Sequence, residues 1–158
     1  MEHEHLYNLT VTWTGNRGTG TSDYRAYSRD HEIHCEGKAV RLPGSSDAAF
    51  RGDPARYSPE ELLVASLSSC HMLWFLHLCA DAGIVVTGYR DSATGTMSEH
   101  SDGSGEFTRV TLRPHATITD PSRIDETVEL HRKAEELCFI ARSVNFPVDH
   151  EAAVESVA

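Results

Sequence analysis

The sequence predicts an α+β fold in which antiparallel sheets pack on two long helices. Near the N-terminus, apolar residues recur with a two-residue period that indicates a strand. An apolar helical segment begins near Ser58, and a later helical segment ends near Cys138. The predicted elements follow one another in the order strands, helix, hairpin, helix, strand. This order lacks the βαβ alternation of a parallel sheet. The length of 158 residues fits one domain that spans residues 1–158.

The first third of the chain is expected to form short strands. Apolar residues alternate with polar ones at Tyr7, Leu9, Val11 and Trp13. A glycine-rich turn over residues 14–20 follows, with Arg17 at its tip. Residues 24–27 and 33–42 have the composition of further strands. These segments predict an antiparallel sheet.

The long helix has a strongly specified start. Ser58 is a favourable N-cap, Pro59 suits the first turn, and Glu61 completes a Ser-x-x-Glu capping box. Gly83 is expected to end the helix in a left-handed conformation. One predicted face of this helix carries Leu63, Leu67, Cys70 and Trp74. Other leucines spread apolar surface around the helix, so we expect a homodimer that shares helices to bury it.

The second half predicts a long hairpin, a helix and a final strand. Residues 84–97 and 107–119 form the arms of the hairpin, and Pro114 is expected to restrict the second arm to an edge strand or a bulge. A second helix should run from residue 122 or 124 to Cys138, and residues 144–157 should return as a strand.

Charge and composition exclude several classes of partner. The formal net charge is −10 at pH 7, and no basic run offsets it, which disfavours nucleic acid and anionic membranes. The apolar run over residues 72–86 is interrupted by His77 and Asp81 and is too short to span a bilayer. No leader-like segment opens the sequence, so we expect a cytoplasmic protein.

The four cysteines are expected to be free or redox-active rather than structural. They are Cys35, Cys70, Cys79 and Cys138. No Cys-x-x-Cys pair is present, which weakens both a thioredoxin-type motif and a structural zinc site.

Cys70 needs a stabilising partner if it is to react as a thiolate inside an apolar helix. Arginine suits that role because it stays charged and donates several hydrogen bonds. Glu60 is ten residues earlier, about 15 Å along the same helix, and could anchor such an arginine without touching the sulfur. The alternative is that Cys70 is a core residue, Glu60 complements the helix dipole and the arginines are solvated.

The segment Ser58-Pro59-Glu60-Glu61-Leu62-Leu63 through Ser69-Cys70 resembles the cysteine helix of the OsmC/Ohr family, the osmotically inducible and organic hydroperoxide resistance proteins. Glu136-Leu137-Cys138 resembles the end of that family's second helix. The resemblance implies a single OsmC/Ohr-like domain, an intertwined homodimer, and a thiol peroxidase that acts on organic hydroperoxides and perhaps hydrogen peroxide, with no metal or organic cofactor.

The same resemblance implies the role of each site residue. Cys70 would be oxidised to a sulfenic acid, Cys138 would capture it as a disulfide, and an external dithiol such as a dihydrolipoyl protein would reduce that bond. Glu60 would orient an active-site arginine, which Arg17 matches. Two further arginines compete for that role, namely Arg51 and Arg56.

Three alternatives stay open from the residues themselves. An apolar substrate pocket lined by Trp74, Phe75 and Phe139 competes with plain core packing. A non-enzymatic small-molecule-binding or scaffold protein with structural cysteines would use the same fold. A metal site is the third alternative, and its candidate ligands are His31, His34, Cys35, Cys70, His71, His77 and Cys79.

Overall fold

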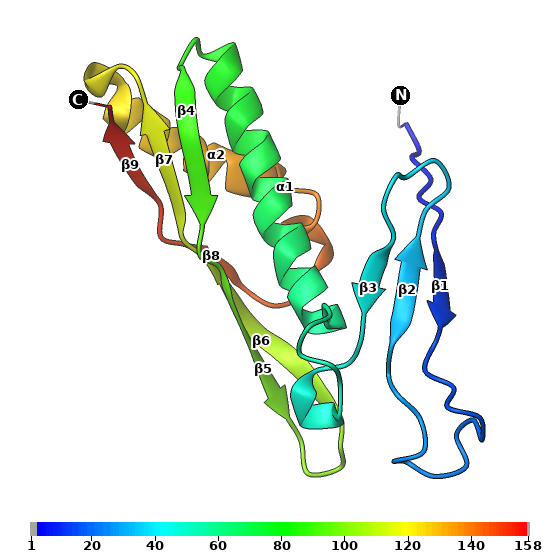
Figure 1. Ribbon diagram of the computed structural model, residues 1–158. Helices are drawn as coiled ribbons and strands as arrows, with labels where there is room; N and C mark the ends of the chain where they lie inside the picture. Colours follow the sequence, from blue (N-terminus) through cyan, green and yellow to red (C-terminus); the bar gives the residue numbers. More distant parts are fainter. Residues whose placement is uncertain (1–2, 158) are drawn as a thin grey trace. The chain divides into compact units, whose positions relative to one another are not determined.

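The computed structural model describes residues 3–157 (Figure 1). Contacts divide the chain into two compact units, one up to Leu62 and one from Leu63 onward. The expectation of one domain over residues 1–158 stays a prediction.

The first unit contains a three-stranded antiparallel sheet. Its strands are β1 (Thr10–Trp13), β2 (His31–His34) and β3 (Leu42–Gly44), in the spatial order β1-β2-β3. A 3₁₀ turn at Ala48–Phe50 precedes the first helix. The predicted strand over residues 33–42 is therefore two shorter strands, and Cys35 directly follows β2 rather than lying in it.

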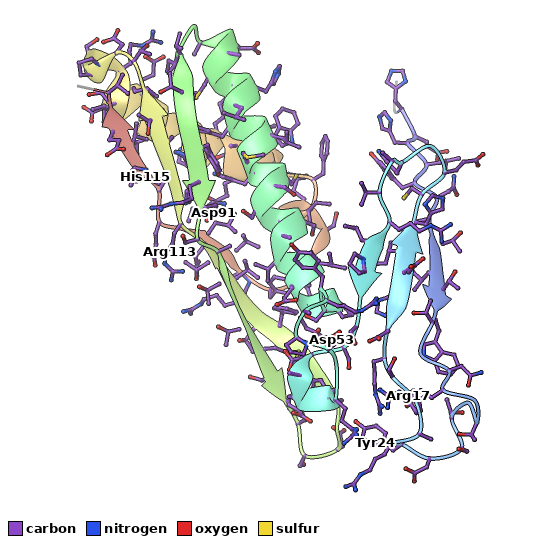
Figure 2. All side chains as sticks on the ribbon, viewed as in Figure 1. Arg17, Tyr24, Asp53, Asp91, Arg113 and His115 are labelled. Atoms are coloured by element: carbon purple, nitrogen blue, oxygen red, sulfur yellow. The ribbon has the colours of Figure 1, made fainter. Side chains whose placement is uncertain are left out.

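The prediction of a strand at residues 24–27 is wrong. This segment turns in the connection between β1 and β2, where Figure 2 shows Tyr24 and Arg17. The guanidinium carbon of Arg29 lies 4.3 Å from the ring centroid of Tyr24 and 4.1 Å from that of Tyr27. Arg29 also donates to both backbone carbonyls at 2.8 Å. The aromatic side chains stabilise this loop through cation–π contacts rather than filling a sheet face.

Helix α1 (Pro59–Asp81) begins and ends as the sequence predicts. The Ser58 backbone N–H donates to Glu61 at 2.9 Å, and the Glu61 N–H donates to the Ser58 hydroxyl at 3.2 Å, which completes the capping box. Gly83 has a φ of 68°, the left-handed conformation expected after a helix C-terminus.

The buried face of α1 is not the predicted one, because only Leu67 among Leu63, Leu67, Cys70 and Trp74 is buried. The buried residues are Leu67, His71, Phe75 and Cys79, a single stripe at four-residue spacing. Other apolar side chains of the helix stay partly or largely exposed, and the side chain of Leu73 is 62% exposed. By length and composition alone, α1 could cross a membrane, a property that it shares with core helices of soluble proteins.

Two mixed sheets form the second unit with the helices. Their six strands are β4 (Val86–Asp91), β5 (Thr94–Glu99), β6 (Gly105–Leu112), β7 (Pro114–Ile118), β8 (Val148–His150) and β9 (Ala153–Ser156). The sheet orders are β4-β7-β9 and β5-β6-β8. The pairs β6–β8 and β7–β9 are parallel, so the expectation of purely antiparallel sheets is wrong. The C-terminal residues form two short strands instead of one.

The long hairpin is confirmed, but it passes from one sheet to the other halfway along. Figure 2 shows Asp91 and Arg113 at this passage. The Arg113 N–H donates to one carboxylate oxygen of Asp91 at 2.7 Å, and the Ser68 hydroxyl of α1 donates to the other at 2.5 Å. Pro114 begins β7, the central strand of its sheet, so the edge-strand prediction is wrong. The first residue of a strand tolerates proline.

Helix α2 (Ile124–Leu137) follows a 3₁₀ turn at Pro121–Arg123 and agrees with the predicted second helix. It has 14 residues against 23 in α1, so only α1 is notably long. A core of residues from α1, β7 and α2 includes Phe75, Cys79, Ile118 and Ala134. The α+β class is thereby confirmed, while the intertwined homodimer stays a prediction.

Candidate functional site

Cys70 and Cys138 come together from two helices of the second unit. Cys70 lies on α1 and is partly exposed, whereas Cys138 follows the last residue of α2 and is 1% exposed. Both thiols are free. Burial raises the pKa of Cys138 to about 11, and a side-chain hydrogen bond with Cys70 contributes to the rise. The structure thus pairs an accessible thiol with a buried one.

The raised pKa keeps Cys138 protonated at neutral pH. Its S–H can donate to the sulfur of Cys70, and its own sulfur accepts a hydrogen bond from the Ala141 N–H at 3.4 Å. The pair therefore suits a reaction in which Cys70 acts first as the nucleophile and Cys138 reacts second.

Glu60 lies in the first turn of α1 with an unsatisfied carboxylate. Its Oε2 is buried and has no hydrogen-bond partner among residues 3–157. Buried polar atoms without partners are rare and costly, so such an atom marks a place where another group is expected to bind. Glu60 and Arg17 belong to the first unit, and Cys70 and Cys138 to the second.

No candidate arginine bonds to Glu60 within the described residues. Arg17 is exposed in the turn after β1. Arg56 lies 3.8 Å from the carboxylates of Asp30 and Asp53. It also donates to a backbone carbonyl of β2. Arg51 ends the 3₁₀ turn before α1 in a left-handed conformation. Arg56 has two acidic neighbours, and all three arginines stay candidates for pairing with Glu60.

An aromatic pair, partly buried at Trp74 and exposed at Phe139, flanks the two cysteines. Trp74 is one turn after Cys70 on α1, and Phe139 directly follows Cys138. Their ring centroids are 5.5 Å apart in an edge-to-face arrangement, and Phe139 is 66% exposed. Leu73, Trp74 and His77 line a surface hollow of about 260 Å³. An apolar ligand can therefore contact this surface.

Phe75 does not belong to that surface, although the sequence pattern grouped it with Trp74 and Phe139. It is fully buried, and its ring stacks on His131 with centroids 3.8 Å apart. Cys79 is likewise a core residue, as expected, and burial raises its pKa to about 11.

Sequence reasoning missed a buried cluster of histidines. His71 on α1 and His131 on α2 are joined by a hydrogen bond of 3.0 Å between Nε2 and Nδ1. His150 on β8 lies against His71, with ring centroids 4.4 Å apart. Burial lowers the pKa of His71 to about 3 and that of His131 to about 4. The four-residue spacing of His71 with Leu67, Phe75 and Cys79 was the one signal in the sequence, and it concerned His71 alone.

The metal-site alternative gains no support from the geometry. Across residues 3–157, no three or more His, Cys, Asp or Glu side chains are arranged to hold a metal ion. The candidate ligand His71 instead bonds to His131.

Known proteins share this architecture. The family model described as OsmC-like protein matches residues 52–152. The solved structure of an OsmC-like protein of unknown function from Vibrio cholerae is 33% identical, with a TM-score of 0.84. That match covers 94% of this chain and 99% of the Vibrio cholerae chain. No curated protein shows a significant match.

Two organic hydroperoxide resistance proteins have similar structures. The one from Elizabethkingia anophelis is 17% identical with a TM-score of 0.64, over 98% of this chain and 100% of its own. The one from Legionella pneumophila is 17% identical with a TM-score of 0.63, over 96% and 99%. At that identity the likeness shows the fold alone. The family model spans most of the chain, and the 33% identical relative spans nearly all of it, so this protein belongs to the OsmC-like family, as the motif around Cys70 predicts.

Proposed function

We propose that the protein is a thiol-dependent peroxidase that reduces organic hydroperoxides, with hydrogen peroxide as a smaller second substrate. The observation that carries this proposal is the pair of free thiols in an OsmC-like chain, with Cys70 partly exposed and Cys138 buried and close enough to Cys70 for the two thiols to influence each other. Solved structures of similar fold include organic hydroperoxide resistance proteins, which supports the choice of substrate class.

The chemistry proceeds in three balanced steps. The Cys70 thiolate attacks the distal peroxide oxygen, an S–O bond forms as the O–O bond breaks, and the alkoxide leaves and takes a proton as alcohol. Cys138 then attacks the Cys70 sulfenic acid, an S–S bond forms, and its proton leaves with the hydroxyl as water. An external dithiol, such as a dihydrolipoyl group, reduces the disulfide and is itself oxidised to a disulfide.

Arg17 and Glu60 are proposed to complete the site. A carboxylate that binds an arginine bidentately fixes the plane of the guanidinium, which leaves further N–H donors for a peroxide oxygen or a thiolate. The buried, unpartnered Oε2 of Glu60 and the exposed position of Arg17 support this pairing. Arg51 and Arg56 are the rivals, since both lie closer in the sequence to Glu60.

We also propose a homodimer in the cytoplasm. Exposed apolar side chains occur in both units, including Val11 (57%) and Trp13 (44%) on β1 and Leu73 on α1. A second copy would bury apolar surface of this kind. Four free cysteines suit a reducing compartment.

Steady-state turnover tests the proposal. The pure protein should consume cumene hydroperoxide in the presence of dihydrolipoamide, and Cys70→Ser should abolish turnover. Cys138→Ser should allow the first oxidation but not sustained turnover with the dithiol. Cys35→Ser is the matched control, because Cys35 is a partly exposed free thiol that the proposal does not use. Full activity in Cys70→Ser would refute the proposal and favour the binding or scaffold alternative.

A further inference from the structure

A buried hydrogen bond connects the two helices that bring the cysteines together. His71 is fully buried on α1, and His131 is 2% exposed on α2. Their Nε2 and Nδ1 atoms are 3.0 Å apart, and the rings are nearly parallel, with centroids 5.3 Å apart. In the part of the chain that the structure describes, no other hydrogen bond joins a side chain of α1 to a side chain of α2.

The hydrogen bond is close in the chain to both thiols. His71 directly follows Cys70, and His131 is seven residues before Cys138, about two turns or 10 Å along α2. A shift of one helix against the other would therefore move the two sulfurs apart and also break this bond. The histidine pair and the cysteine pair fix the same relative position of the helices.

We propose that His71 and His131 are positioning residues whose hydrogen bond holds Cys70 and Cys138 at the spacing that disulfide closure requires. The role of that closure in a catalytic cycle rests on the proposed function, whereas the positioning does not. Disulfide formation is sensitive to small changes in the separation and direction of the two Cβ atoms.

Packing makes the bond specific to one arrangement. Phe75, one turn after His71, stacks on the His131 ring with an interplanar angle of 8°. The second nitrogen of each histidine, Nδ1 of His71 and Nε2 of His131, is buried without a hydrogen-bond partner among the described residues. A displacement that broke the bond would therefore add two more buried nitrogens without a partner to these two, at a cost in free energy.

The bond also requires the accepting ring to be neutral, since one nitrogen donates and the other accepts. Burial lowers the pKa of both histidines, which keeps them neutral at physiological pH. Burial lowers the pKa of the third histidine, His150, and is the largest effect on it. Three carboxylates act in the opposite direction and raise that pKa: Glu135 of α2, 3.3 Å from the His150 ring, Asp91 of β4 and Asp149 of β8. The phenol of Tyr89 completes the charged and titratable surroundings of the cluster.

The experiment measures disulfide formation separately from peroxide chemistry. The protein is equilibrated in mixtures of reduced and oxidised glutathione, and the Cys70–Cys138 disulfide is quantified by mass spectrometry after alkylation. Glutathione disulfide supplies the oxidising equivalent and leaves as two thiols, so no peroxidase activity is needed. The rate of closure after one equivalent of cumene hydroperoxide is measured beside it, together with the rate of sulfenic acid formation in a Cys138→Ser background.

Three variants separate positioning from packing. His131→Phe keeps a flat aromatic ring, somewhat larger than imidazole, but removes the hydrogen bond, and it should lower both the equilibrium constant and the rate of closure about tenfold. His131→Asn places a polar atom near the Nδ1 position and should restore most of both. His100→Phe changes an exposed histidine of the hairpin tip and should alter neither. The rate of sulfenic acid formation should be the same in all of them.

Three results would overturn the positioning role. The first is an unchanged disulfide equilibrium in His131→Phe, and the second is a failure of His131→Asn to rescue it. The third is the absence of the disulfide from the unaltered protein in oxidising glutathione, since the spacing would then not permit the bond. If His131→Phe does not fold, His131→Gln takes its place. The glutamine amide lies near the Nε2 position rather than the Nδ1 position, so His131→Gln should not restore the disulfide equilibrium, whereas His131→Asn should. A protein without peroxidase activity whose disulfide equilibrium still depends on His131 would refute the proposed function and keep the positioning role.

Discussion

Acidification should destabilise the second unit through its buried histidines. The pKa of His71 is lowered to about 3 and that of His131 to about 4, mainly by burial, from the usual value near 6.5. Below that usual value the unfolded chain takes up protons that the folded protein excludes. Stability is therefore fully present above about pH 6.5 and is lost as the pH falls toward the folded pKa values.

The size of the loss follows from the two shifts. Between about pH 7 and pH 5, each of these histidines should remove about 2 kcal/mol from the free energy of unfolding, or about 4 kcal/mol together. That is a large share of the 5–15 kcal/mol typical of a folded domain. Like-charge repulsion within the cluster acts in the same direction, because charge on His150 lowers the pKa of both neighbours.

Urea unfolding at several pH values measures this dependence. A Trp13→Phe background leaves Trp74 as the only tryptophan, so fluorescence then reports the second unit. His131→Asn should reduce the loss between pH 7 and pH 5 by about 2 kcal/mol. His100→Asn should not change it, since that histidine is exposed. A stability that stays flat over this range, or an equal slope in His131→Asn, would refute the reasoning.

Three further predictions concern the proposed site and the helix that carries it. Phe139→Ala should raise KM several-fold for cumene hydroperoxide but not for hydrogen peroxide, because only the larger substrate reaches the aromatic pair of Trp74 and Phe139. Equal changes in KM for both substrates would contradict this. Glu60→Gln and Arg17→Gln should each lower kcat/KM, and the double variant should be no worse than the poorer single one; additive losses would argue against their pairing. Ser58→Ala should lower the free energy of unfolding by about 1 kcal/mol through loss of the capping box, and an unchanged urea midpoint would show that the cap contributes nothing.

Local chemistry accounts for the features that the sequence predicts well. Ser58 and Glu61 specify the start of α1 by reciprocal hydrogen bonds over four residues, so no tertiary information is needed. Gly83 specifies its end in the same local way. The two cysteines were paired by resemblance to a family rather than by spacing, and their pairing as a disulfide stays a prediction.

Tertiary contacts decide the features that the sequence predicts poorly. Tyr24 and Tyr27 have strand composition, but Arg29 engages both rings in a loop. Pro114 is tolerated in a central strand because it opens β7 where the hairpin changes sheets. His131 has no sequence signal as a buried residue, because histidine is usually partly exposed and its partner on α1 is 60 residues away.

The most direct test of the central claim is mass analysis of the reduced protein after one equivalent of an organic hydroperoxide. A Cys70–Cys138 disulfide should form in near-stoichiometric amount, and Cys138→Ser should instead carry one added oxygen on Cys70 as a sulfenic acid. Unmodified Cys70 in both proteins, with the peroxide unconsumed, would contradict the assignment of the two thiols.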